Sequence, residues 1–372
     1  MKKIVISAVN IVEAGTLAIL KDCLAYLSKL AEKEDIEIIA VVHKKALADF
    51  PNITYIETTW PKKRWINRLW YEYVSLKKVS KEIGSVFLWF SLHDTSPSVI
   101  ANRRAVYCHN SYSFYRWKFH DLIFAPKIAL FAMFTKYIYQ TNIHKNDYLV
   151  VQQNWFREAM SRIFKINKNR IIVAPAHFNK AITDTAANTK DSDSSDTYQF
   201  LFPASPNSHK NFEVICKAAE LLEKRHLFKP FKIVLTVSGA ENKYASWLYK
   251  NWHQIQPIDF RGFVKKEELK ELYQQSNCLI YPSKVESWGL PISEFSAYNK
   301  PMLLADLPYA KETAAGSIKT AFFNPENAEE LAMLMENLIK GEEKDLKAVP
   351  LLKIAEPIAN NWNELFTILM RD

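Results

Sequence analysis

The sequence lacks the features that would place it among disulfide-stabilised, zinc-binding or membrane-spanning proteins. Its four cysteines are scattered and show no paired spacing, so we expect buried thiols in a reducing compartment. No uninterrupted apolar run is long enough to span a membrane, and residues 1–9 are too soon interrupted for a signal peptide. We therefore expect a cytoplasmic protein. The cysteines are Cys23, Cys108, Cys216 and Cys278.

Metal-binding patterns are also missing. No group of His, Cys or acidic residues has convincing ligand spacing. Asp191-Ser192-Asp193 spells an Asp-x-Asp pattern, but it lies in a low-complexity segment with no hydrophobic strand to hold it in place. We predict that the protein has no metal site and needs no cofactor.

The charge balance favours anionic partners. The formal net charge is +9, which suits nucleic acid, acidic lipid or a nucleotide diphosphate. Over residues 60–81, lysines and arginines alternate with Trp65, Trp70, Tyr71 and Tyr73 on a predicted helix. Two interpretations stay open: a solvated helix whose aromatic rings pack inward, or a surface that docks on the inner face of the cell membrane. Only the net charge suggests nucleic-acid binding and no motif supports it, so we expect no nucleic-acid partner.

The first half alternates β-rich runs with helical patterns. Such alternation predicts a parallel sheet with helices on both faces. The expected strands are residues 4–9, 36–42, 86–90, 105–109 and 148–152, and the expected helices are residues 16–33, 65–83 and 122–139.

The second half repeats this alternation after a polar interruption. Residues 181–197 contain no aromatic residue and only Ile182 as a large apolar one, which is typical of a linker or loop. The expected strands beyond it are residues 199–203, 232–237, 258–261, 278–281, 302–304 and 320–323. Helices are expected to begin at Asn211, Glu267, Pro291 and Asn327, with a last helix over residues 354–370.

Two glutamates with seven residues between them follow one of these expected strands. Glu286 lies in a turn and Glu294 about one turn into a helix that Pro291 is suited to begin. The amides of Gly289 and Leu290 would point outward at a positive helix end, which favours an anionic group such as a diphosphate. The two carboxylates cannot themselves bind a phosphate, so their expected partners are hydroxyls. A ligand with hydroxyls beside a diphosphate is a nucleotide sugar.

This motif, with Gly-Leu-Pro inside it, resembles that of the family-4 retaining glycosyltransferases, which have the GT-B fold. The resemblance covers roughly residues 199–340. It includes Arg261-Gly262-Phe263-Val264, the run Glu267 to Tyr273 and Ser208-His209-Lys210-Asn211, in the family's order and spacing. The first half is matched more loosely, mainly by Tyr107-Cys108-His109-Asn110.

The resemblance implies an α/β protein with two Rossmann-like domains facing across a cleft. We expect an N-terminal acceptor-binding domain over residues 1–180 and a linker over 181–198. A nucleotide-sugar-binding domain would occupy residues 199–353. Residues 354–372 would form a C-terminal helix that crosses back to the first domain.

The resemblance also implies roles for residues of the second half. Lys210 would stabilise the leaving phosphate, either with His209 or without a second cation, and Glu286 would contact hydroxyls of the transferred sugar. Glu294 would bind the ribose hydroxyls. The remaining donor-binding candidates are Ser287 and Trp288 at the sugar, Gly289 and Leu290 at the phosphates, and Phe263 and Val264 at the base, although these last two could equally be core residues.

Candidates in the first half are fewer. Related enzymes often have a glycine-rich loop after the first strand, but here only Gly15, followed by Thr16, stands in that place, with Glu13 as an acceptor-side candidate. His109 would lie near the anomeric carbon or serve as a structural histidine. His93 and Asp94, at another expected strand end, are weaker acceptor-binding candidates.

The function implied is metal-independent, retaining transfer of a hexose from a GDP-sugar or UDP-sugar to a glycan hydroxyl. A lipid-linked acceptor and a role in bacterial surface polysaccharide assembly fit the basic, aromatic segment. A nucleotide-sugar epimerase of the same fold and a non-catalytic glycan-binding scaffold are the alternatives. A glycogen-like phosphorylase lacks support, because no motif for a pyridoxal lysine is present.

Overall fold

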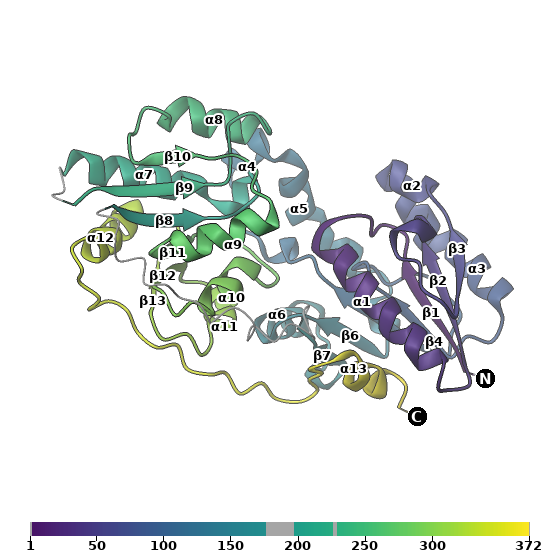
Figure 1. Cartoon of the computed structure of the whole chain (residues 1–372). Coiled ribbons are helices and arrows are strands. Elements are labelled where there is room, and N and C mark those ends of the chain that lie inside the picture. Colours follow the sequence, from purple (N-terminus) through teal and green to yellow (C-terminus); the bar gives the residue numbers. More distant parts are fainter. Residues whose placement is uncertain (1, 176–196, 226–228, 372) are drawn as a thin grey trace. The chain divides into compact units, whose positions relative to one another are not determined.

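The computed structural model describes residues 2–175, 197–225 and 229–371 (Figure 1). The chain divides into two compact units. Unit 1 comprises Met1–Ser113, Met133–Asn179 and Ile354–Asp372, and unit 2 comprises Phe114–Ala132 and Lys180–Lys353. Each unit contains one parallel sheet with helices, so the predicted α/β class is confirmed.

Unit 1 contains a seven-stranded parallel sheet in the order β3-β2-β1-β4-β5-β6-β7. The order reverses beside β1, so loops that follow β1 and β4 lie at a topological switch point. The two edge strands β3 and β7 were not predicted, because they are short and lie outside the strongest apolar runs. The strands are β1 Lys2–Ala8, β2 Ile36–Val42, β3 Ile53–Glu57, β4 Leu88–Ser91, β5 Arg103–Cys108, β6 Tyr148–Val151 and β7 Ile171–Val173.

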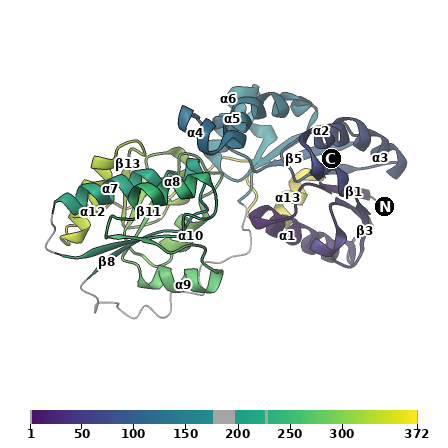
Figure 2. The same ribbon diagram turned by 90° about the horizontal axis from the view of Figure 1, so that it is seen from above.

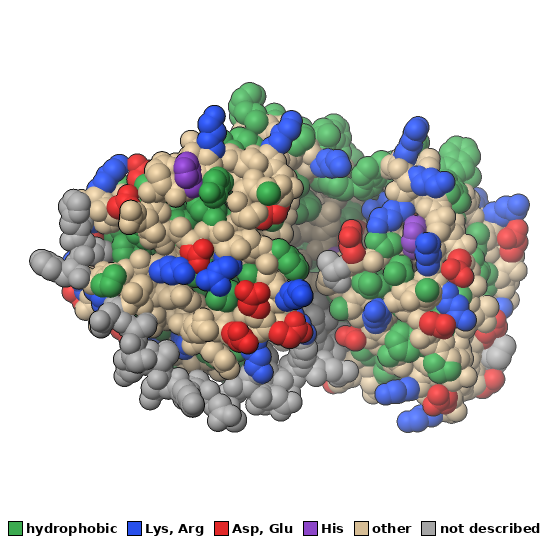
Figure 3. All heavy atoms as spheres, turned by 45° about the horizontal axis from the view of Figure 1, so that its top comes forward, with side chains coloured by type: hydrophobic (Ala, Val, Ile, Leu, Met, Phe, Trp, Pro, Cys, Tyr) green, Lys and Arg blue, Asp and Glu red, His purple; other side chains and the backbone are tan. Residues whose placement is uncertain are grey.

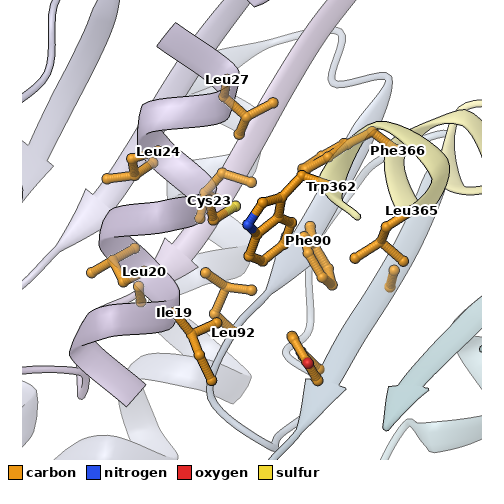
Figure 4. Packing of buried hydrophobic residues seen from close by; sticks show 14 of the residues in the cluster. Ile19, Leu20, Cys23, Leu24, Leu27, Phe90, Leu92, Trp362, Leu365 and Phe366 are labelled. Atoms are coloured by element: carbon orange, nitrogen blue, oxygen red, sulfur yellow. The ribbon is translucent and has the colours of Figure 1, made fainter. Parts of the chain in front are cut away.

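The core of unit 1 includes the C-terminal helix. One face of α1 (Ala14–Ala31) packs with Phe90 and Leu92 of the β4 region, and α13 (Trp362–Leu369) adds Trp362 and Phe366 to the same cluster (Figure 4). The ring of Phe366 stacks on Tyr26 of α1 at 5.6 Å between centroids. Figure 2 shows α1 and α13 side by side in this unit.

The C-terminal helix is shorter than the predicted 354–370. Residues 354–361 before it are not helical, and Ile358 forms a parallel bridge with Val173 of β7. Val173 N donates to Pro357 O, and Ala359 N donates to Val173 O. The helix begins only where the Asn361 side chain accepts a hydrogen bond from Glu364 N, because Pro357 cannot continue a helical ladder.

Two further helices of the first half differ from a regular α-helix. The predicted 65–83 helix is confirmed as one continuous helix, in which a π-helical turn (Tyr71–Ser75) lies between α2 (Trp65–Trp70) and α3 (Leu76–Ile83). The 122–139 helix is divided into α4 (Phe119–Phe124) and α5 (Pro126–Gln140), because Pro126 disfavours helical geometry at the residue before it. Helix α6 (Asn154–Phe164) was not predicted.

Unit 2 contains a six-stranded parallel sheet in the order β10-β9-β8-β11-β12-β13. All six strands predicted for the second half are confirmed, with shifts of one or two residues at their ends. Central strands are buried on both faces, which explains their nearly continuous apolar sequences. The strands are β8 Tyr198–Phe202, β9 Phe231–Leu235, β10 Ile258–Phe260, β11 Cys278–Tyr281, β12 Met302–Ala305 and β13 Thr320–Phe323.

The helices of unit 2 include four that begin within one residue of the predicted positions. Helices α8 and α11 were not predicted, since α11 is short and α8 mixes aromatic and polar residues. The helices that follow β8 are α7 Phe212–Lys224, α8 Lys243–Trp252, α9 Lys266–Gln275, α10 Leu290–Ser296, α11 Pro308–Thr313 and α12 Ala328–Ile339.

One assignment to the first domain needs correction. Residues 114–132 belong to unit 2, although they precede most of it in the chain. Buried Asp121 accepts a hydrogen bond from Ser208 Oγ at 2.6 Å, and His120 lies 5.0 Å from the ring of Trp247. These contacts join residues far apart in sequence, which local patterns do not reveal. The predicted linker lies outside the described residues, apart from Thr197 and Tyr198, which begins β8.

The four cysteines are free and buried, as predicted. Within the described ranges, no helix combines the length and apolarity needed to cross a bilayer.

Candidate functional site

The predicted catalytic pair of unit 2 lies at the switch point of its sheet. Strands β8 and β11 are neighbours at the centre of the sheet, and the strand order reverses between them. Lys210 ends a short 3-10 turn (Ser208–Lys210) after β8, and Glu286 lies in the loop after β11. Ligands of open parallel sheets bind at such points, outside the carboxyl ends of the strands.

Lys210, Glu286 and Tyr281 form a compact hydrogen-bonded group. Glu286 Oε1 accepts from Lys210 Nζ and from the Tyr281 hydroxyl, the latter at 3.0 Å. Lys210 Nζ also lies 3.5 Å from that hydroxyl. An ammonium has three N–H donors, so one remains for a ligand after these two contacts.

The electrostatics of this group keep Glu286 ionised. Burial by itself raises the pKa of the Glu286 carboxyl, but the charge and the hydrogen bond of the Lys210 ammonium outweigh it, and the pKa is lowered. Burial and the neighbouring Glu286 charge raise the pKa of Tyr281, so its hydroxyl remains a donor at neutral pH. The side chains of Lys210 and Glu286 are each 14% exposed, so both are within reach of a ligand.

His209 is not a second cation. Its side chain is buried, and this burial, together with the adjacent Lys210 charge, lowers the pKa of His209 to about 3. The ring is therefore neutral at neutral pH, which favours the alternative in which Lys210 acts without a second charged histidine. The His209 carbonyl accepts from Lys284 N at 2.8 Å, which links the loops after β8 and β11.

The loop that carries Lys210 is held by residues that the sequence analysis did not identify. Asp121 of α4 is 2% exposed and accepts from Ser208 Oγ, from the Tyr115 hydroxyl at 2.9 Å and from Lys118 N at 2.8 Å. Ser208 is two residues before Lys210 and fully buried. No local motif signals this contact, because Asp121 and Ser208 are 87 residues apart in the chain.

The second glutamate lies on α10, one turn beyond Gly289. Helix α10 begins at Leu290 and not at Pro291, which takes the second helical position. Half-buried Glu294 accepts from the Tyr273 hydroxyl of α9 at 2.9 Å through Oε2. The neighbouring Glu294 charge adds to burial in raising the pKa of Tyr273, so this tyrosine donates and positions the carboxylate.

Gly289 allows the turn before α10. It is in the left-handed region, with φ +89, and an added Cβ would lie 3.2 Å from Ile292 Cδ1 and 3.5 Å from the Tyr309 ring. An L-residue in this region costs about 1–2 kcal/mol. A glycine at this position therefore lets the chain turn from Glu286 into the helix that carries Glu294.

Replacing Gly289 with alanine is expected to lower the free energy of unfolding by about 1–2 kcal/mol and to weaken nucleotide binding. Gly341→Ala is the matched control, because Gly341 has φ +82 but no atom within 4 Å of an added Cβ. Urea unfolding and nucleotide titration would separate the two effects. Equal nucleotide affinity in Gly289→Ala and the unmodified protein would contradict this role for the turn.

The remaining donor candidates of unit 2 are accessible to different degrees. Ser287, Trp288 and Leu290 are half-buried, and Trp288 Nε1 donates to Ser293 Oγ at 3.2 Å. Phe263 is 84% exposed, which rules out the alternative of a core residue at this position. Val264 beside it is half-buried.

The candidates of unit 1 lie after its central strands. The Thr16 hydroxyl donates to Glu13 O at 3.2 Å, and an added Cβ at Gly15 would meet no atom within 4 Å. His109 Nε2 lies 3.1 Å from Leu92 O, and Nδ1 lies 3.2 Å from Gln152 Nε2. Burial lowers the pKa of His109. Its ring is therefore neutral, donates through Nε2 and accepts through Nδ1, so both nitrogens are engaged within unit 1.

A buried charged cluster at the switch point of unit 1 was not predicted. The π-helical turn points Glu72 inward, where Oε1 lies 2.9 Å from Arg68 Nε and 3.3 Å from His93 Nδ1. Ser7 Oγ lies 3.0 Å from His93 Nε2. This Ser-His-Glu order resembles a nucleophile with its base, but Ser7 is fully buried within β1, so no substrate reaches it.

The weaker candidates of unit 1 have structural partners. Asp94 Oδ1 accepts from the backbone amides of His109 and Asn110 and from the Tyr139 hydroxyl. Burial lowers the pKa of His93, so this ring is neutral. As for metal sites, the described residues contain no group of three or more His, Cys, Asp or Glu side chains that could hold an ion. Asp191 and Asp193 lie outside the described residues.

The region that carries Lys210, Glu286 and Glu294 also matches a known family. Residues 184–349 match the model of Glycosyl transferases group 1. The O-antigen chain mannosyltransferase RfbU of Salmonella typhimurium is 20% identical over 330 residues, 84% of either chain. An uncharacterized glycosyltransferase of Methanocaldococcus jannaschii is 23% identical over 144 residues, which cover 39% of this chain and 36% of that protein.

Solved structures show the same fold. The lipopolysaccharide outer core galactosyltransferase WaaB aligns with a TM-score of 0.63 at 12% identity, covering 92% of this chain and 91% of that one. A glycosyltransferase from Rickettsia africae aligns with a TM-score of 0.60 at 18% identity, with the same coverage. Together with the two parallel sheets, these neighbours establish the predicted GT-B fold.

Proposed function

We propose that this protein is a retaining glycosyltransferase that moves a hexose from a nucleoside-diphosphate sugar to a glycan hydroxyl without a metal ion. The observation that carries the proposal is the Lys210-Glu286-Tyr281 group at the switch point between β8 and β11. It lies within the segment that matches Glycosyl transferases group 1. Two nearby features complete the donor site, the turn at Gly289 and the carboxylate of Glu294.

The reaction breaks the bond between the anomeric carbon and a diphosphate oxygen. Lys210 donates to that oxygen as negative charge develops on it, and Glu286 accepts from a hydroxyl of the departing sugar. The acceptor hydroxyl attacks from the side that the diphosphate leaves, and its proton passes to the diphosphate. The products are the glycoside and the nucleoside diphosphate, so no covalent protein intermediate is needed.

The names of similar proteins support a hexose as the transferred sugar. RfbU is named a mannosyltransferase and WaaB a galactosyltransferase, so the proposed sugar is a hexose. The Anabaena protein HepE, with a TM-score of 0.56, is described in complex with UDP and glucose. We propose a GDP-hexose or UDP-hexose donor, and the HepE complex supports the second of these. The acceptor would be a growing surface polysaccharide, because two of these names concern O-antigen and lipopolysaccharide.

Thermal unfolding with GDP, UDP, dTDP and NAD tests the donor site. A ligand at about one hundred times its dissociation constant adds about 2.7 kcal/mol to stability. We expect one nucleoside diphosphate to raise Tm, and Glu294→Ala to remove that shift. The exposed Glu329→Ala on α12 is the control and should retain it. A shift with NAD alone would overturn the transferase proposal.

Product analysis separates the alternatives. The unmodified protein should release the nucleoside diphosphate from its sugar donor faster when an acceptor is present. An epimerase would convert the donor without an acceptor, and a glycan-binding scaffold would leave it intact. Either of these results would replace the proposal.

We further propose that unit 1 docks on an anionic membrane through residues 60–81, next to a lipid-linked acceptor. The aromatic rings of α2 do not all pack inward, because Trp65 is 44% exposed and Trp70 60% exposed. Ile66 is 71% exposed and Val74 47% exposed. Figure 3 shows hydrophobic and basic side chains next to each other on this part of unit 1. Rings at headgroup depth beside cations are suited to anionic lipid.

Vesicle sedimentation tests the membrane proposal. The protein should bind phosphatidylglycerol vesicles much more strongly than phosphatidylcholine vesicles, and added salt should weaken the binding. The double variant Ile66→Ser, Trp70→Ser should bind at least 10-fold more weakly. Tyr249→Ser is the control, because Tyr249 is an exposed aromatic residue of unit 2. Equal binding to both vesicle types would contradict the proposal.

A further inference from the structure

The edge of the unit 2 sheet that β13 forms is only partly covered. Strand β13 pairs with β12 on one side, where Met302 N donates to Lys319 O and Asp306 N donates to Phe323 O. Backbone groups of a strand alternate between its two sides. Residues 319, 321 and 323 therefore bond to β12, while the amide and carbonyl of Thr320 and Phe322 point to the outer edge.

A segment after α12 covers the first of these outward positions. Thr320 N donates to Lys347 O at 3.0 Å, and Lys347 N donates to Thr320 O at 2.9 Å. This is one rung of an antiparallel ladder, and the next rung would pair Phe322 with Asp345. The chain turns away instead, because Leu346 N bonds to Glu343 O and Asp345 Oδ2 accepts from Asn337 Nδ2.

The outward N–H and C=O of Phe322 are therefore left without a partner in the parts of the chain that the structure describes. A cavity of about 600 Å³ lies at this place, between β13, α12 and the segment around Lys347. Its apolar lining includes half-exposed Met333 of α12 and Leu352. Its volume is typical of ligand sites, and it shares no lining residue with the proposed donor site.

Two lysines and two carboxylates line this cavity, and three of these four side chains have partners of their own. Lys311 Nζ lies 2.6 Å from Asp306, and Glu330 Oε2 accepts from Asn324 N. Asp345 is held by Asn337. Exposed Lys347 has neither an ion pair nor a side-chain hydrogen bond among the described residues, so its ammonium is available to a ligand in the cavity. An acidic side chain would complement it.

We propose that this cavity binds an extended peptide segment of a partner protein, which adds to the edge of β13 at Phe322. Main-chain hydrogen bonds to the Phe322 amide and carbonyl would set its register, as in β-strand addition. An apolar side chain would contact Met333 and Leu352, and an acidic one would pair with Lys347. The inference does not depend on the proposed transferase activity.

A random 12-residue peptide library displayed on phage, selected on the full-length protein, would test this site. Selected peptides would be synthesised and their affinities measured by fluorescence polarisation. Phe322→Pro removes the outward amide N–H without removing a hydrogen bond to β12, and it is compatible with an edge strand. Because it also removes the ring, Phe322→Ala is the control for that loss. We expect Phe322→Pro to bind at least 10-fold more weakly than Phe322→Ala, and Lys347→Glu to weaken binding of acidic peptides.

Hydrogen exchange gives a second measurement on the unmodified protein. The amide of Phe322 should exchange faster than that of Thr320, and a selected peptide should slow it selectively. Nucleoside diphosphate binding should be unchanged in these variants, which keeps a failure here distinct from failure of the donor site. The inference would be overturned if the selection enriched no peptide that binds saturably. Equal affinities in the proline and alanine variants would also overturn it, as would a Phe322 exchange rate that the peptide leaves unchanged.

Discussion

Replacing Lys210 with methionine is expected to lower kcat for sugar transfer by about 30- to 900-fold. Removal of one preorganised donor to a developing negative charge costs about 2–4 kcal/mol, and each 1.36 kcal/mol corresponds to a factor of ten. Lys210 is well placed for this role because its side chain is only 14% exposed. The ionised carboxylate of Glu286 beside it holds the ammonium in position. Methionine retains the aliphatic stem and removes the charge.

Release of nucleoside diphosphate from the donor would measure this effect. Lys250→Met is the matched control, because Lys250 is an exposed lysine on α8 of the same unit. The KM for the donor should change less than kcat, since the charge on the leaving oxygen is greatest in the transition state. Turnover within a factor of three of the unmodified enzyme would exclude Lys210 as the stabilising cation.

Replacing Glu286 with glutamine is expected to lower kcat by about 100-fold and to lower the free energy of unfolding by about 1–3 kcal/mol. The amide cannot accept at both oxygens, and it no longer balances the Lys210 charge. The Tyr281 hydroxyl also loses a charged acceptor. Turnover and stability should therefore fall together in this variant.

A double-mutant cycle distinguishes a direct role of Glu286 from an indirect one. If Glu286 only positions Lys210, the variant Lys210→Met, Glu286→Gln should be no slower than Lys210→Met alone. If Glu286 also contacts the sugar, the double variant should be slower still. Glu326→Gln provides the control, because Glu326 forms a 2.5 Å ion pair with Lys118 on the exposed surface of unit 2. Normal turnover in Glu286→Gln would contradict both roles.

Glu286 and Lys210 were predicted on different grounds. The position of Glu286 after a strand is predictable because Cys278–Tyr281 is a short apolar run bounded by polar residues. The role of Lys210 came from a resemblance, since a lysine in a turn has no distinguishing pattern of its own. Neither apolar patterning nor the family resemblance predicted Tyr281 as the shared partner of Glu286 and Lys210. Its position at the end of an apolar run is equally suited to a core residue.

The strands of the second half were predictable because each is a local apolar run that alternates with a helical pattern. Predictions from the sequence failed where the structure depends on contacts between residues far apart in the chain. Residues 114–132 were assigned to the wrong unit, since only Asp121 and its partner Ser208 reveal their place. Apolar periodicity likewise did not resolve the helix division at Pro126 or the π-helical turn inside the 65–83 helix.

The amino-acid sequence by itself determined the α/β class, the strands of the second half, the unpaired cysteines and the acidic pair around Gly289. Local propensity and apolar patterning are sufficient for these features. Only the tertiary structure decided which loops meet. Lys210 and Glu286 are 76 residues apart and become neighbours because β8 and β11 pair at the centre of the sheet. The neutral state of His209 was likewise decided there, because burial and the adjacent Lys210 charge set its pKa.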